Sequence, residues 1–98
     1  MNRYLAEMHT PVTATEEFVA LIPAQWEKVT KLMRAGVIAS YSLALDRSKL
    51  WVVFSADSET EAMQLLGGLP LTRFMRTELS PLAFHEVGDT HTTQLIMN

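Results

Sequence analysis

Polar and apolar residues alternate with a period of two at the start of the chain. Tyr4, Ala6 and Met8 fall on one side of residues 3–9, and mostly polar side chains fall on the other. This period is typical of a β-strand, in which successive side chains point to opposite faces. Pro11 follows and should end the strand, because proline has no amide hydrogen to donate to a sheet.

The next segment changes to a helical period. Apolar residues recur every three to four positions after Thr13, and Thr13 with Glu16 has the spacing of a capping box. Pro23 interrupts this pattern but suits the first turn of a helix, where an amide hydrogen has no partner. We therefore expect a short helix near 15–21 and a longer one that starts at Pro23 and stops at Gly36.

Two apolar runs in the middle of the chain predict a hairpin. Residues 37–45 and 50–56 are rich in β-branched, aromatic and small side chains, and the polar residues 46–49 between them predict the turn. Residues 50–54 are apolar at both odd and even positions. Such a strand is expected in the centre of a sheet that is covered on both faces.

One more helix and a last strand are predicted after the hairpin. Ser58 and Glu61 repeat the capping-box spacing, and Gly67 with the next glycine should end the helix. Residues 76–85 alternate again and predict a strand. Pro81 favours an edge position or a bulge for it, since proline cannot donate to a neighbouring strand.

The predicted order is β-α-β-β-α-β, which is that of ferredoxin-like domains. This α+β fold is a four-stranded antiparallel sheet with both helices on one face. The second face then needs a cover, and a second copy of the sheet would supply it and make a homodimer. We expect one domain over residues 1–86, followed over 87–98 by a C-terminal tail or an arm laid on a neighbouring subunit.

Composition narrows the classes of function. The chain has 98 residues, a net charge of −3, 19% charged residues and no cysteine. Disulfides, thiolate nucleophiles and Cys-ligated zinc are excluded, and the charge does not fit a nucleic-acid partner. The uncharged stretches are shorter than the roughly 20 residues of a membrane span, and no signal peptide is recognisable. We expect a cytoplasmic protein with no membrane contact.

Residues 69–85, with the sequence LPLTRFMRTELSPLAFH, resemble the C-terminal signature of the muconolactone δ-isomerase family. In that family a Leu-Pro-Leu turn leads to an aromatic-Met pair and a Pro-Leu-Ala-x-His ending, and the resemblance extends over about 15–86. It implies a dimeric α+β barrel, often in larger rings of dimers, with a small-molecule pocket and no cofactor. The family carries basic residues on its second strand. Residues 37–45 carry no charge here, so we expect a substrate other than muconolactone itself.

Two residues are candidates for proton transfer. His85 matches the end of the family signature, and histidine is a common proton-transfer group; the alternative is a histidine that bonds a backbone carbonyl at a strand end. Glu78 lies on an otherwise apolar strand side, which would raise its pKa toward the range of a general base. A solvent-facing glutamate is the alternative.

Further residues are candidates for binding a ligand. Glu7 and His9 share one side of the first strand, and the hydroxyls of the second strand could donate to an enolate-like oxygen. Arg73 and Arg76 could clamp an acidic ligand, or else bridge subunits or face water. The full set of binding candidates is Glu7, His9, Ser40, Tyr41, Ser42, Trp51, Arg73 and Arg76. Trp26 is expected to serve in packing.

The sequence leaves three functions open. The first is a cofactor-independent isomerase that moves a proton on a small, largely apolar carbonyl compound. The second is a non-catalytic oligomeric ligand-binding or scaffold protein, and the third is a cofactor-free monooxygenase, an activity also found on dimeric α+β barrels. The histidines and carboxylates lack the spacing of a known metal motif, so no metal is expected.

Overall fold

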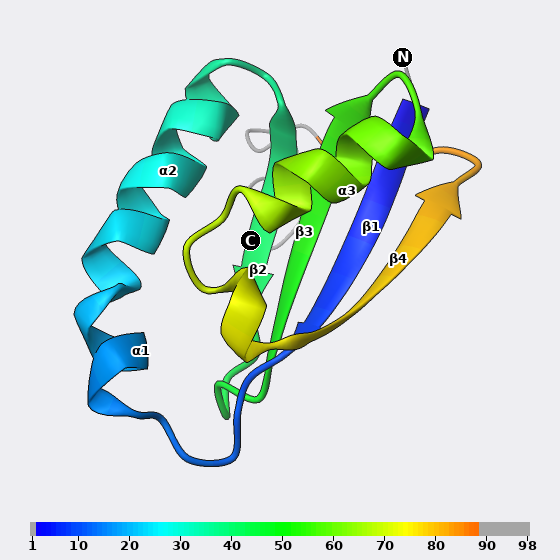
Figure 1. The fold of residues 1–98 in the computed structure, drawn as a ribbon. Helices are drawn as coiled ribbons and strands as arrows, with labels where there is room; N and C mark the ends of the chain where they lie inside the picture. Colours follow the sequence, from blue (N-terminus) through cyan, green and yellow to red (C-terminus); the bar gives the residue numbers. More distant parts are fainter. Residues whose placement is uncertain (1, 89–98) are drawn as a thin grey trace, which may run out of the picture.

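The computed structural model describes residues 2–88 and has the predicted order of elements (Figure 1). The elements are β1 (Asn2–His9), α1 (Glu16–Ala20), α2 (Ile22–Arg34), β2 (Ile38–Leu43), β3 (Lys49–Ala56), α3 (Glu59–Gly67), the 3₁₀ helix η1 (Thr72–Phe74) and β4 (Arg76–Leu82). The last strand is shorter than predicted. The predicted tail over 87–98 lies mostly outside the described residues.

The four strands form one antiparallel sheet in the order β2-β3-β1-β4. This is the ferredoxin-like arrangement, and β3 has a neighbour on each side, as its apolar run predicted. β4 is an edge strand, as Pro81 predicted, and Pro81 is paired with Tyr4. The register of β2 shifts between Ile38 and Ser40, a bulge that leaves Ala39 without a partner.

The hydrophobic core lies between the sheet and the helices. Met8 and Val52 are fully buried on the strands, and Val29 of α2 and Leu66 of α3 pack against them. Figure 1 shows α2 and α3 over the same face of the sheet. We call the opposite face the open face, because none of the described helices lies on it.

The structure corrects one predicted helix start. Thr15, not Thr13, is the N-cap of α1: its hydroxyl accepts a 3.1 Å hydrogen bond from the amide of Phe18. A capping residue must stand directly before the first turn with an extended backbone, and Thr15 has that conformation. The second expected cap is confirmed, since the Ser58 hydroxyl accepts a hydrogen bond from the Glu61 amide.

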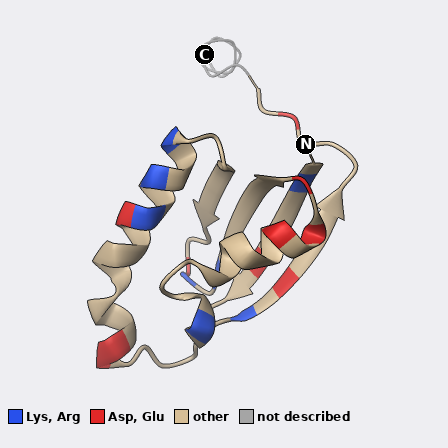
Figure 2. Ribbon diagram, turned by 45° about the horizontal axis from the view of Figure 1, so that its top comes forward, with Lys and Arg blue, Asp and Glu red and all other residues tan. Residues whose placement is uncertain are grey.

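Charged side chains follow the helix dipoles. Lys31 and Arg34 lie in the last turn of α2, and Glu59 and Glu61 lie in the first turn of α3 (Figure 2). Each charge thus sits at the helix end of opposite partial charge. Within residues 2–88 no helix has the length and apolar character needed to cross a bilayer.

Candidate functional site

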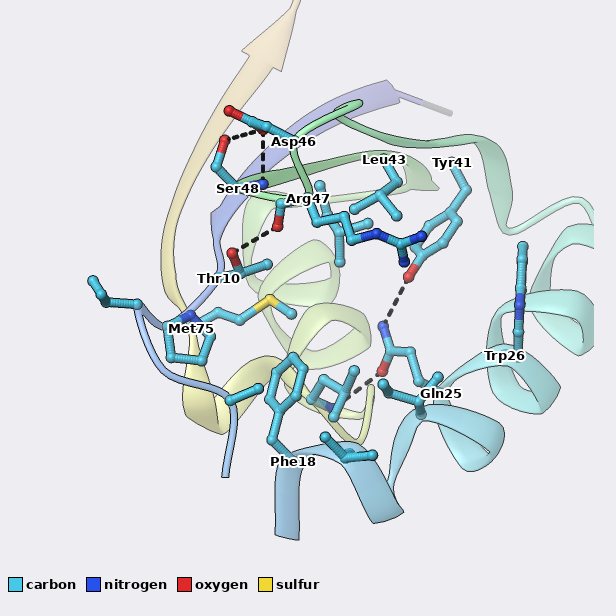
Figure 3. A pocket seen from close by; sticks show the side chains of 17 residues that line it. Thr10, Phe18, Gln25, Trp26, Tyr41, Leu43, Asp46, Arg47, Ser48 and Met75 are labelled. Atoms are coloured by element: carbon cyan, nitrogen blue, oxygen red, sulfur yellow. Dashed lines mark hydrogen bonds between the residues drawn. The ribbon is translucent and has the colours of Figure 1, made fainter. Parts of the chain in front are cut away.

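A cavity of about 700 Å³ opens between α1, α2 and the β2–β3 hairpin, on the helix side of the sheet (Figure 3). Its volume is within the range of small-molecule sites. The walls are mostly apolar, and the described residues that line it are Thr10, Pro11, Val12, Ala14, Phe18, Val19, Ile22, Gln25, Trp26, Tyr41, Leu43, Asp46, Arg47, Ser48, Leu50, Leu71 and Met75.

Aromatic contacts hold two walls of the cavity. Phe18 of α1 meets Phe74 of η1 edge to face, with ring centroids 5.7 Å apart. Trp26 of α2 lies against Tyr41 of β2 with the same centroid separation. Trp26 is nonetheless 58% exposed, so the packing expected of it is against Tyr41 at the rim of the cavity.

Gln25 links three elements on the inner side of the cavity. Its side chain is almost fully buried, with 3% of its surface exposed. The amide oxygen accepts a 3.1 Å hydrogen bond from the backbone N–H of Leu71, and the amide nitrogen donates a 3.2 Å hydrogen bond to the hydroxyl of Tyr41. One side chain of α2 thereby connects the loop before η1 to strand β2.

Tyr41 presents a neutral hydroxyl to the cavity. Burial raises its pKa above the usual 10.0, and the hydrogen bond from Gln25 opposes this rise in part. The phenol therefore keeps its proton at physiological pH. In Figure 3 its hydroxyl points toward Gln25 at the inner side of the cavity.

The hairpin turn supplies the charged part of the rim. One oxygen of Asp46 accepts hydrogen bonds from the hydroxyl and the amide of Ser48, at 2.6 Å and 3.0 Å. These bonds, the hydroxyl first, lower the pKa of Asp46 below 3.8. Arg47 has a left-handed backbone with φ of 64°, and its carbonyl accepts a 2.8 Å hydrogen bond from Thr10.

Arg47 and Asp46 differ in their interactions. Ser48 holds one oxygen of Asp46, whereas none of the salt bridges of the described residues includes Arg47. Arg47 is the one cation and Asp46 the one carboxylate among the described lining residues. The rim thus offers a guanidinium beside a largely apolar hollow.

Only one of the sequence-predicted binding residues lines this cavity. That residue is Tyr41. Ser40 and Ser42 lie on the open face, since they pair with Val53 and Trp51 and the bulge does not bring them round to the side of Tyr41. Arg73 sits on η1, forms an exposed ion pair with Glu17 and lies over the ring of Phe74.

Four other predicted residues gather on the open face. Glu7 and Glu78 are direct cross-strand partners, and Trp51 pairs with Glu7 from the other side. The Trp51 indole donates a 3.0 Å hydrogen bond to Glu7, and His9 Nε2 lies 3.3 Å from the other Glu7 oxygen. The Trp51 hydrogen bond is the main reason that the pKa of Glu7 falls below 4.5, with smaller help from Lys49 and His9.

We call Glu7, His9 and Glu78 the carboxylate–histidine cluster. Each offers one potential metal-ligand atom, and these atoms all lie within 4.8 Å of one another. Two cations flank the cluster, because Lys49 and Arg76 are the register partners of His9. The fold thus assembles from two strands a group that spacing along the chain could not reveal.

His85 lies at the other end of the sheet from the cavity. Strand β4 begins at Arg76, opposite His9 near the cavity, and ends at Leu82, opposite Arg3, so His85 follows the end of the strand that is remote from the cavity. The Nε2 atom of His85 is buried and has no hydrogen-bond partner among the described residues.

Several cavity residues were missed by the sequence reasoning. Asp46 and Arg47 fall within the polar residues 46–49, which predicted only the hairpin turn. Gln25 carried a usable signal: it is a polar residue at an apolar position of the α2 period, and a buried polar side chain is informative because it requires partners.

Comparison with known proteins agrees with the fold and identifies the family. A sequence model of the muconolactone delta-isomerase family matches residues 3–87. A crystal structure of muconolactone isomerase is similar to this chain with a TM-score of 0.69 and 21% sequence identity, over 88% of this chain and 93% of that one. No curated protein sequence matches the chain. At this identity the solved structure supports the fold alone.

Proposed function

Because the chain belongs to the muconolactone delta-isomerase family, we propose that it is a cofactor-independent isomerase that acts on a small, largely apolar carbonyl compound in the cavity. The observation that carries the proposal is the position of the Tyr41 hydroxyl in an otherwise mostly apolar hollow. Ligand sites commonly combine apolar walls with a few placed polar groups that orient the ligand.

The proposed reaction moves one proton and one double bond. A base removes a proton from the carbon between a carbonyl group and a carbon–carbon double bond, and the electron pair shifts onto the carbonyl oxygen. The Tyr41 hydroxyl donates a hydrogen bond to that oxygen and stabilises its negative charge. The proton then returns to the far end of the former double bond, so no oxidant or reductant is consumed.

We assign the base to Asp46. It is the one carboxylate among the described lining residues, and an aspartate is ionised at neutral pH, which is the form that accepts a proton. The competing assignments are His85 and Glu78, which the sequence pattern favoured. Within one chain neither lines the cavity, so either would have to act from a neighbouring subunit.

The position of Arg47 at the rim suggests that the substrate carries an acidic group. A guanidinium at the rim of an apolar site attracts an acidic substituent on the ligand. A carbonyl compound with an apolar body and one acidic group at its edge would meet both Arg47 and Tyr41.

The test uses α-angelica lactone, a small lactone whose double bond lies out of conjugation with its carbonyl. The protein should accelerate the shift into conjugation, seen as an increase in ultraviolet absorbance and as deuterium uptake in D₂O. Asp46→Asn should lower the rate about 100-fold or more, the usual contribution of a general base. Asp57→Asn, an exposed carboxylate after β3, is the matched control and should behave like the wild type.

Other outcomes would change the assignment. A loss of rate in Glu78→Gln or His85→Gln with full activity in Asp46→Asn would move the base to that residue. Binding of the lactone without proton exchange would indicate a ligand-binding protein. Consumption of oxygen with a quinol-like substrate would indicate a monooxygenase.

A further inference from the structure

Gln25 has a fixed orientation that determines the direction of the hydrogen bond at Tyr41. The backbone N–H of Leu71 can only donate, so the end of the Gln25 amide that faces it must be the oxygen. The NH₂ end must then face Tyr41. Because an amide NH₂ can only donate, the hydroxyl oxygen of Tyr41 accepts this bond.

The hydroxyl proton of Tyr41 is therefore left for another partner. A phenol oxygen that accepts one hydrogen bond still carries its own O–H, which rotates to suit an acceptor. Among the hydrogen bonds of the described residues, Tyr41 donates none. The cavity into which the hydroxyl projects is the space where such an acceptor can lie.

We propose that Gln25 is a positioning residue that turns Tyr41 into a hydrogen-bond donor toward the cavity, so that the site selects ligands with an oxygen acceptor at that point. This inference rests on the proposed function and adds what the bound group must offer, which is an oxygen that accepts the Tyr41 proton. A ligand with an N–H donor at the same place would leave the Tyr41 proton without a partner, which is costly in a buried site.

The direction of the hydrogen bond between Gln25 and Tyr41 does not depend on pH near neutrality. The Gln25 amide carries no titrating group, and burial keeps the Tyr41 phenol protonated. A Gln25→Glu substitution would make the same pair pH-dependent. The introduced carboxyl group, when protonated, would donate to Tyr41 as the glutamine does. When ionised, it would accept the Tyr41 proton and withdraw it from the ligand.

The experiment uses 2(5H)-furanone labelled with ¹³C at its carbonyl, a neutral lactone that does not titrate between pH 5 and 8. Its affinity is measured by NMR titration, and its bound carbonyl stretch by isotope-edited infrared spectroscopy. In the wild type we expect the carbonyl stretch of the bound furanone at a lower frequency than that of furanone in a solvent that donates no hydrogen bond. We expect its affinity to be independent of pH.

Two variants test the relationship. Tyr41→Phe keeps the ring but lacks the donor, and should return the stretch to higher frequency and weaken binding up to about tenfold, the worth of one hydrogen bond. Gln25→Glu should resemble the wild type at low pH and lose affinity as the pH rises and the introduced carboxyl group ionises. A merely structural role for Gln25 would not produce this pH-dependent carbonyl shift.

A further variant protects the test against misfolding. Gln25→Met has a similar length and no polar atoms, so it should weaken furanone binding equally at every pH; circular dichroism and thermal melting establish that each variant folds. An unchanged carbonyl stretch in Tyr41→Phe, or a pH-independent Gln25→Glu, would overturn this inference alone. A wild-type protein that does not bind furanone would overturn the proposed function and this inference together.

Discussion

The indole N–H of Trp51 donates a 3.0 Å hydrogen bond to the carboxylate of Glu7, across strands β3 and β1 on the open face. This bond fixes the orientation of Glu7 beside its cross-strand partner Glu78, although like charges directly opposite each other are unfavourable. The carboxylate–histidine cluster is thus on the opposite side of the sheet from the cavity. We therefore assign ligand binding to the polar residues of the cavity and not to the carboxylate–histidine cluster, which lies on the open face.

Trp51→Phe should raise the pKa of Glu7, because the indole hydrogen bond is the largest cause of its lowering. Since the folded pKa lies below the ordinary 4.5, Glu7 contributes stability that is present above pH 4.5 and is lost as the pH falls through the folded value. NMR titration of the Glu7 side chain measures the change. The pKa of Asp46, which is lowered by Ser48, should not change in this variant. An unchanged pKa of Glu7 would contradict the role given to the Trp51 hydrogen bond.

Ser48→Ala should raise the pKa of Asp46, since the Ser48 hydroxyl is the largest cause of its lowering. If Asp46 is the base, activity requires its ionised form and declines as the pH falls through its pKa. The acid limb of the rate profile for α-angelica lactone should therefore move to higher pH in this variant. Ser80→Ala, on the exposed part of β4, is the matched control. An acid limb that stays in place would argue against Asp46.

Gly36→Ala should destabilise the fold by about 1 kcal/mol, because Gly36 has φ of 75° and a side chain is disfavoured there. A Cβ at this position meets nothing within 4 Å, so the cost comes from the backbone alone. Gly67→Ala is the paired variant: its Cβ also meets nothing, and it ends α3 without a positive φ. It should stabilise the protein by about 0.5 kcal/mol. Denaturant unfolding of both variants measures these opposite signs.

The fold was largely predictable because its local signals agree. The alternation of Tyr4, Ala6 and Met8 identified the buried side of β1, and Pro81 placed β4 at an edge. The error at Thr13 came from the capping-box spacing, which Thr13 satisfies with Glu16, whereas the actual cap Thr15 has Phe18 three residues later. Only the backbone conformation directly before the helix distinguishes Thr15 from Thr13.

The site was harder to predict, since it depends on contacts between distant segments. Glu7 and Glu78 meet only through the register of β1 with β4. Gln25 and Leu71 are 46 residues apart, and their hydrogen bond exists only because the loop before η1 folds back onto α2. A single sequence shows that Gln25 is polar on an apolar face but does not show which partner it binds.

A homodimer formed through the open face is the expected assembly. Leu5 and Trp51 are partly exposed there, beside the charged side chains of the carboxylate–histidine cluster, and a second sheet would cover them. Leu5→Asp should weaken association in sedimentation or native mass spectrometry. Thr30→Asp adds the same charge to the exposed side of α2 and should leave it unchanged. A wild-type monomer at micromolar concentration would contradict the expectation.

A crystal structure of the protein with 2(5H)-furanone would show where the ligand binds. We expect the lactone to lie in the cavity between α1, α2 and the β2–β3 hairpin, with its carbonyl oxygen within hydrogen-bonding distance of the Tyr41 hydroxyl. A lactone bound instead at the carboxylate–histidine cluster or beside His85 would show that the functional site lies outside this cavity, and would contradict the proposed function.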